Sequence, residues 1–134
     1  IYTAARAGAV ARLRIKDVVD DGSQRLLRFA EKGGKERLIP VRHDLEQLLN
    51  EYRALAKLTD APGDTPLFRT AAGKSNRLTV NWLTGLDVWR IVKRRLRATG
   101  LPERLRPHSF RVLAVTDLLG QGVSLEDVQM LAGH

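Results

Sequence analysis

His108 and Arg111 are the pair of residues whose types and spacing best suit phosphate chemistry. They lie three positions apart in Pro107-His108-Ser109-Phe110-Arg111, so on a helix both side chains project from one face. An arginine fork can hold two phosphate oxygens, and an imidazole can transfer a proton near neutral pH. By itself the pair fits two interpretations, a phosphate site or a surface helix cap with an ion pair. Pro107 suits a fixed helix start under either one.

Arg6, Lys32 and His134 extend this inventory. Arg6 stands in a small, apolar segment where a charge is costly unless paired, so it either contacts an anion or extends into water. Lys32 lies in a glycine-rich turn, where it could donate a proton to a leaving oxygen or merely make the turn soluble, and Lys35 is easily confused with it. His134 follows a glycine typical of a helix end. Together these residues could hold and protonate a phosphodiester, but no obvious nucleophile accompanies them.

The positive charge of the chain is concentrated in one segment. The 134 residues have a formal net charge of +8. Residues 74–111 contain ten Lys and Arg against two Asp and Glu, whereas residues 1–73 contain thirteen against ten and residues 112–134 none against three. Such a segment predicts a surface that faces phosphates, and a solvated helix face is the alternative. The candidate DNA-binding residues are Lys35, Lys74, Arg77, Arg90, Lys93, Arg94 and Arg97.

Composition excludes several classes of protein and site. The chain has no cysteine, which excludes disulfides, thiolate metal sites and cysteine nucleophiles. No apolar run approaches the roughly 18 residues of a membrane span, and no signal-peptide pattern opens the chain. We therefore expect no membrane contact and a cytoplasmic, nucleoid-associated location. Because the chain begins with Ile1 and stops at a histidine, we expect both ends to be cut.

The element pattern predicts an α+β fold that is mainly helical, with one small antiparallel sheet. Two apolar runs around Gly33-Gly34 are typical of a hairpin. Asp44 and Ser124 are the expected caps of two helices. Residues 1–13 are expected to be the end of a helix. The other expected segments are strands near 26–29 and 38–41, helices over 45–55, 79–98, 109–119 and 125–131, and loops at 60–66 and 73–76.

Four motifs, taken in order, resemble those of the tyrosine recombinase (lambda-integrase-type) family. Thr3 through Arg6 resembles its T-G-L-R box, and Glu31 through Pro40 resembles its G-K-G-x-K-E-R-x-x-P hairpin. The segment Pro107–Arg111 is similar to its P-H-x-x-R box, and Val128–His134 to its I-x-x-L-L-G-H motif. The resemblance extends over nearly the whole chain, and it implies the family's catalytic fold, with a small sheet packed on a helical bundle.

The resemblance also implies roles for the site residues. Arg6 and Arg111 would clamp the non-bridging oxygens of a scissile phosphate in DNA. Lys32 would protonate the departing 5′ oxygen, His108 would transfer a proton to or from the nucleophile, and His134 would hydrogen-bond the phosphate. Family members attack with a tyrosine, form a 3′-phosphotyrosine link and then rejoin strands. They need no metal and no other cofactor, they act on double-stranded DNA, and they assemble as tetramers.

The sequence departs from the family pattern at informative places. The family's tyrosine lies a few residues beyond the position of His134, and Tyr2 and Tyr52 fall in the wrong motifs to replace it. Ala9 occupies a usually acidic position, and Val112 replaces a frequent histidine. We also expect the family's amino-terminal DNA-clasping domain to lie outside these 134 residues. The expectation is thus a single partial catalytic domain, residues 1–134, that binds DNA weakly and does not cleave it.

Two alternatives stay open at this point. The first is a type IB topoisomerase-like enzyme, which would use the same residues to relax supercoiled DNA without exchanging strands between partners. The second is a basic DNA-binding module without activity, which the Ala9 substitution would suit. Relaxation of DNA without any sequence preference would favour the first alternative. Binding assays on substituted chains would separate the second from an enzyme.

Overall fold

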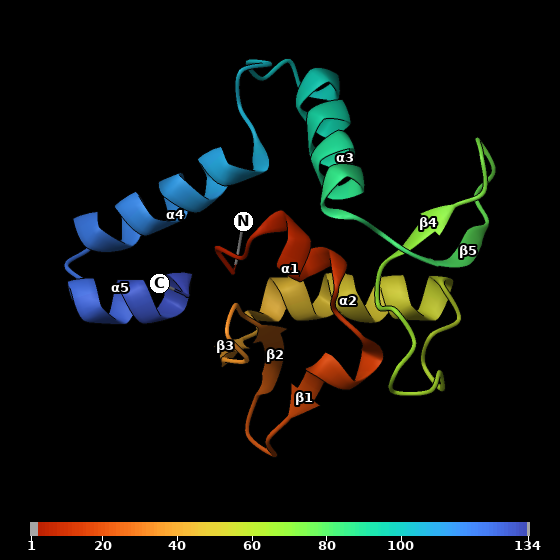
Figure 1. Cartoon of the computed structure of the whole chain (residues 1–134), viewed down its shortest axis with the longest axis horizontal. Coiled ribbons are helices and arrows are strands. Elements are labelled where there is room, and N and C mark those ends of the chain that lie inside the picture. Colours follow the sequence, from red (N-terminus) through yellow and green to blue (C-terminus); the bar gives the residue numbers. More distant parts are fainter. Residues whose placement is uncertain (1–2, 134) are drawn as a thin grey trace. The chain divides into compact units, whose positions relative to one another are not determined.

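The computed structural model describes residues 3–133, and these form two compact units. Unit 1 combines the amino-terminal segment, through Ala11, with the segment that begins at Thr84. Unit 2 comprises Arg12–Leu83. The elements of each unit are labelled in Figure 1. The composition of the fold is that of an α+β protein, as the sequence predicts.

Unit 2 is built on a three-stranded antiparallel sheet in the order β1-β2-β3. A short 3-10 turn over Ile15–Asp17 precedes it. Its strands are β1 (Val18–Asp20), β2 (Arg25–Ala30) and β3 (Glu36–Pro40), so the predicted hairpin is confirmed. Every second residue is buried on one face, where Leu27, Phe29 and Ile39 form part of the core.

Helix α2 (His43–Leu55) completes the core of unit 2. Its Leu49 is buried, and the Tyr52 hydroxyl donates a hydrogen bond to the carbonyl of Leu67 at 2.7 Å. On the sheet side, Arg25 of β2 forms an ion pair with Glu46 at 3.5 Å. Asp44 is not the cap that we expected: Arg42 occupies that position in extended conformation, and Asp44 is a residue of the first turn whose carboxylate accepts from the Leu45 amide.

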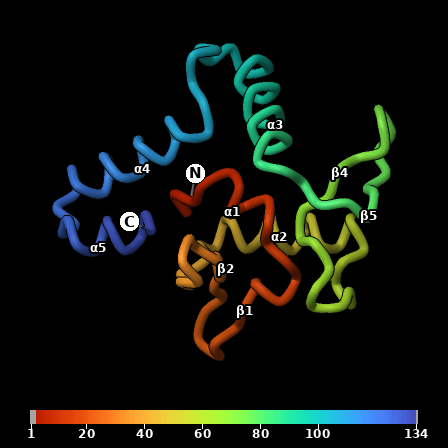
Figure 2. The backbone as a smooth tube through the Cα atoms, viewed as in Figure 1, coloured from red at the N-terminus to blue at the C-terminus, as the bar shows by residue number. Residues whose placement is uncertain are grey.

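Residues 78–83 correct the sequence prediction most clearly. A helix was expected from about 79, but β5 (Leu78–Trp82) pairs antiparallel with β4 (Arg69–Ala71) as a second, two-stranded sheet. Figure 2 shows the backbone path of β4 and β5. The hydroxyls of Thr70 and Thr79 are hydrogen-bonded across it at 2.5 Å. β-branched Thr79 and Val80 suit a strand, and pairing with a distant segment decides the outcome here.

Unit 1 is helical, with α1 (Ala7–Ala11), α3 (Gly85–Ala98), α4 (Pro107–Gly120) and α5 (Leu125–Ala132). α1 packs on α3, and α4 packs on α5, which runs back beside it in Figure 1. The predicted Ser124 cap is confirmed, since its hydroxyl accepts from the Asp127 amide at 3.1 Å. The helix expected over residues 1–13 is reduced to α1, and Ala4 before it has a φ of +49°.

Thr84 explains why α3 begins where it does. Its hydroxyl accepts from the Asp87 amide at 3.2 Å, and the Asp87 carboxylate accepts from the Thr84 amide at 2.8 Å. This reciprocal pair satisfies two amides that a helix start would otherwise leave without partners.

Of the helices in the described part of the chain, none combines the length and the apolar character needed to cross a membrane.

Candidate functional site

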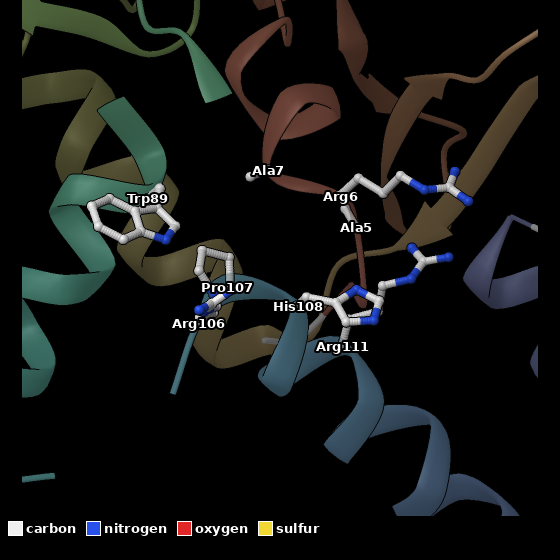
Figure 3. Close-up of a pocket in the computed structure, with 8 residues that line it drawn as sticks. All are labelled: Ala5, Arg6, Ala7, Trp89, Arg106, Pro107, His108 and Arg111. Carbon is white, nitrogen blue, oxygen red and sulfur yellow. The ribbon is translucent and has the colours of Figure 1, made fainter. Parts of the chain in front are cut away.

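A pocket of about 310 Å³ in unit 1 contains three of the predicted site residues, Arg6, His108 and Arg111. Figure 3 shows them with their neighbours, and the side chains of Arg6 and Arg111 extend in the same direction. Ala5, Arg6 and Ala7 come from the segment that enters α1, whereas the residues from Arg106 to Arg111 form the start of α4. Two segments about a hundred positions apart in the sequence thus supply two cations and an imidazole to one site.

Arg111 is buried, with only 5% of its surface exposed. Its Nη1 donates to the carbonyl of Ala4 at 2.7 Å, and its Nη2 donates to the carbonyl of Ala132. Ala132 is the last residue of α5, where the helix dipole favours a cation. These bonds fix the plane of the guanidinium, so Arg111 is already oriented before any ligand arrives.

Arg6 is exposed and enters the pocket from the residue just before α1. Its carbonyl accepts from the Val10 amide at 3.0 Å, which ties its backbone to α1. α1 can lie close to α3 because its side chains are small, and the backbones at Gly8 and Gly85 approach each other. Ala9, at the position that the family often gives to an acid, is buried.

His108 lies in the first turn of α4, one residue after Pro107. The proline occupies the start of the helix, as its position in the sequence predicted. The Ser109 hydroxyl accepts from the Arg106 amide at 3.1 Å, which fixes the entry of the chain into the helix. The amides of a first turn carry partial positive charge, so the site adds a helix amino terminus to its two arginines. An anion such as a phosphate suits this combination.

Trp89 and Arg106 also line the pocket, and the sequence analysis missed both. Arg106 directly precedes the Pro107–Arg111 motif, and this position in the basic segment could have drawn attention to it. Trp89 lies on α3, four residues before Lys93, whose ammonium lies 5.6 Å from the centre of a Trp89 ring. That i, i+4 spacing is the signal that could have linked the two.

The basic residues of α3 are accessible on the helix surface. Arg90, Arg94 and Arg97 are exposed, and Lys93 is half-buried. Arg90 lies 3.7 Å from the Asp87 carboxylate, and Arg97 lies 3.0 Å from that of Glu103. Exposed pairs of this kind contribute little to stability, so phosphates could replace the carboxylates as partners.

The remaining predicted residues lie outside the pocket. Lys32 and Lys35 belong to the turn between β2 and β3 of unit 2, and both are exposed. Lys74 and Arg77 lie between β4 and β5, also exposed. His134 lies outside the described residues. Within residues 3–133, no group of three or more His, Cys, Asp and Glu side chains is arranged to hold a metal ion.

The sequence of the chain matches the model of one protein family, the phage integrase family, over residues 1–134. The chain belongs to the phage integrase family. The resemblance of its four motifs to tyrosine recombinases is therefore confirmed at the level of the family.

The curated relatives of this phage integrase domain are tyrosine recombinases. It is 32% identical over 118 residues to tyrosine recombinase XerC of Brucella suis, covering 88% of this chain and 35% of that protein. It is 33% identical over 120 residues to tyrosine recombinase XerD of Xanthomonas campestris, covering 83% of this chain and 35% of that protein. The chain thus spans about a third of the length of these relatives.

Solved structures of recombinases share the fold. The crystal structure of XerA recombinase superposes with a TM-score of 0.78 at 25% identity, covering 99% of this chain and 45% of that one. The XerH site-specific recombinase, bound to its difH substrate in a pre-cleavage complex, gives a TM-score of 0.77 at 25% identity, covering 99% of this chain and 36% of that one. The predicted fold class is therefore confirmed.

Proposed function

We propose that this chain is the core of the catalytic domain of a site-specific DNA recombinase that breaks and rejoins DNA strands through a 3′-phosphotyrosine intermediate. The observation that carries the proposal is the pocket shared by Arg6, His108 and Arg111 at the start of α4. Membership of the phage integrase family and the likeness to XerC and XerD support it. The proposed substrate is double-stranded DNA, and the solved XerH site-specific recombinase is bound to its difH substrate.

The two arginines have different tasks in this proposal. Buried Arg111 is a fixed donor, oriented by the carbonyls of Ala4 and Ala132. Exposed Arg6 lines the same pocket and would contact the non-bridging oxygens. Negative charge accumulates on these oxygens as phosphorus becomes five-coordinate, and prearranged cations stabilise that charge more than they stabilise the ground state.

The proton movements follow from the bonds that form and break. A tyrosine oxygen attacks phosphorus, and its proton passes to His108. The bond from phosphorus to the 5′ oxygen breaks, and Lys32 donates a proton to that oxygen. His134 hydrogen-bonds a non-bridging oxygen. Rejoining reverses these steps with a 5′ hydroxyl from the partner strand, and neither a metal nor another cofactor takes part.

The nucleophile is proposed to follow His134 in the parent protein, because Tyr2 and Tyr52 lie in other motifs. The 134 residues themselves are then expected to bind DNA weakly, through Lys35, Lys74, Arg77 and the basic side of α3, and not to cleave it. In the parent protein, a tetramer would bring two recombination sites together, and the reaction would take place at the nucleoid of a bacterial cytoplasm.

Trapping of a covalent intermediate tests this proposal. The 134-residue chain, and a version extended by the residues that its gene encodes after His134, are incubated with a nicked suicide substrate carrying the protein's own recombination site. The extended chain should form a covalent protein–DNA adduct and the short chain none. Substitution of the first tyrosine after His134 by phenylalanine is the matched control and should remove the adduct.

Three outcomes would contradict the proposal in different ways. An adduct formed by the 134-residue chain would show a nucleophile within it. Absence of any adduct from the extended chain would favour a basic DNA-binding module. Relaxation of supercoiled DNA without sequence preference and without strand exchange would favour a topoisomerase-like enzyme.

A further inference from the structure

A buried ion pair lies at the base of the turn that carries Lys32. The carboxylate of Glu31 and the Nη2 of Arg37 are 3.0 Å apart, and their side chains are only 11% and 7% exposed. Arg37 lies directly opposite Phe29 in the β2–β3 register, and its guanidinium carbon is 5.2 Å from the centre of the Phe29 ring. Phe29 is fully buried. The pair therefore belongs to the core face of the hairpin.

A buried pair of this kind is a poor device for stability alone. Removal of two charges from water costs several kcal/mol per ion, and an apolar pair of similar volume is often at least as stable. The best-supported role of such a buried pair is to favour one specific local arrangement of the chain. The arrangement in question here is the turn that begins one residue after Glu31.

The turn needs such restraint because its own backbone is permissive. Gly33 and Gly34 have φ values of +81° and +77°, and a Cβ at either position would meet nothing within 4 Å. The Glu31 amide donates to the carbonyl of Lys35 at 2.7 Å, which closes the turn at its base. Glu31 thus fixes the turn in two ways. Its backbone amide closes the base of the turn, and its side chain pairs with Arg37 on the core face.

We propose that Glu31 and Arg37 are positioning residues that hold the turn so that the Lys32 ammonium reaches the leaving 5′ oxygen. The inference rests on the proposed function, in which Lys32 is the general acid. Lys32 is exposed on a flexible four-carbon stem, so its effective concentration at the oxygen depends on how firmly its backbone is held. A loss of the pair leaves the acid present but places it less accurately.

Two leaving groups distinguish this role from a structural one. Cleavage by the extended chain is measured with an oxygen at the 5′ bridging position of the scissile phosphate and with a sulfur there. A thiolate leaves without being protonated, so a defect in proton donation disappears with the sulfur substrate. The variants are Glu31→Gln, which keeps the shape of the side chain, and Arg37→Lys, which keeps its charge. Lys32→Ala is the reference, and exposed Glu36→Gln on the same hairpin is the matched control.

The expected result is selective. Glu31→Gln should slow cleavage of the oxygen substrate by about tenfold or more, since small misplacements of a catalytic group have effects of that order. Glu31→Gln should cleave the sulfur substrate at nearly the rate of the extended chain without a substitution. Arg37→Lys should show a smaller loss, again only on the oxygen substrate. Glu36→Gln should show no loss on either substrate. Suppose that the sulfur substrate restores cleavage by Lys32→Ala. Equal losses of Glu31→Gln on both substrates, or no loss on either, would then overturn the inference. If Lys32→Ala is not rescued, the assignment of Lys32 as the acid fails, and this inference falls with it.

Discussion

Arg111 donates to the backbone carbonyl of Ala4 at 2.7 Å, across 107 positions of the sequence. The same guanidinium also bonds to Ala132 at the end of α5. One buried arginine therefore ties the amino-terminal segment, α4 and α5 together at the pocket. Arg111, which the proposed chemistry requires, therefore also holds segments of unit 1 together.

We predict that the two arginines of the pocket differ in their effect on stability. Arg111→Ala leaves two buried carbonyls without their donor and should lower the free energy of unfolding by about 2–4 kcal/mol. Arg6→Ala, at an exposed position, should lower it by less than about 1 kcal/mol. Urea unfolding of the 134-residue chain measures both. Equal effects of the two substitutions would show that the carbonyl bonds of Arg111 carry no net stability.

The backbone of Ala4 leads to a second prediction. Its φ of +49° lies in the left-handed region, which costs an L-residue about 1–2 kcal/mol. The resembled T-G-L-R box has a glycine at this place. Ala4→Gly should relieve a backbone strain that exceeds the burial free energy of the lost methyl group, which is roughly 0.8 kcal/mol. The melting temperature should therefore rise slightly. Ala5→Gly is the neighbouring control and should lower it. A lower melting temperature for Ala4→Gly would contradict the prediction.

The cap of α3 predicts a pH dependence. Hydrogen bonds from the backbone and then the hydroxyl of Thr84 lower the pKa of Asp87 below its ordinary value of 3.8, and Arg90 adds a smaller effect. Because the pKa is lower in the folded state, the carboxylate stabilises the fold above pH 3.8, and this contribution is lost as the pH falls through the folded pKa.

Thermal unfolding at neutral and acidic pH tests this dependence. Asp87→Asn should lower the melting temperature at neutral pH and should show a shallower fall toward acid than the unmodified chain. Thr84→Ala, which removes the hydroxyl but keeps the amide, should give an intermediate result. If the melting temperature of Asp87→Asn falls with pH in parallel to that of the unsubstituted chain, the Asp87 carboxylate does not contribute to the pH dependence of stability.

The basic side of α3 predicts the salt dependence of DNA binding. If Arg90 and Arg94 each contact a phosphate, each alanine substitution should reduce the slope of log affinity against log salt by about 0.9. Fluorescence anisotropy with a DNA duplex measures this slope for the 134-residue chain. Exposed Lys57, which follows α2, provides the matched control, and Lys57→Ala should leave the slope unchanged. An unchanged slope for the α3 variants would identify the segment as a solvated helix face.

Local signals in the sequence were sufficient where neighbours along the chain decide the structure. The glycine turn between β2 and β3, the Ser124 cap of α5 and the proline at the start of α4 depend on residues within a few positions of one another. The family motifs, read in order, likewise predicted the class of fold and the pairing of Arg6 with Arg111 in one pocket.

Local signals failed where a distant partner decides. Residues 78–82 are a strand because β4 pairs with them, although their pattern suggested a helix. The reciprocal Thr84–Asp87 cap was a signal in the sequence that α3 begins later, at Gly85. Trp89 and Arg106 line the pocket because α3 and α4 pack in unit 1, and no single motif includes both.

The sequence by itself determined which chemical groups this protein can present, namely arginines, lysines and histidines in a family's order. Only the tertiary structure decided that Arg111 is buried and bonded to Ala4 and Ala132, and that Glu31 and Arg37 meet beneath the Lys32 turn. The physical reason is that the state of a charged group depends on the solvent it loses and the carbonyls or carboxylates it gains. Those partners come from segments that only folding brings together.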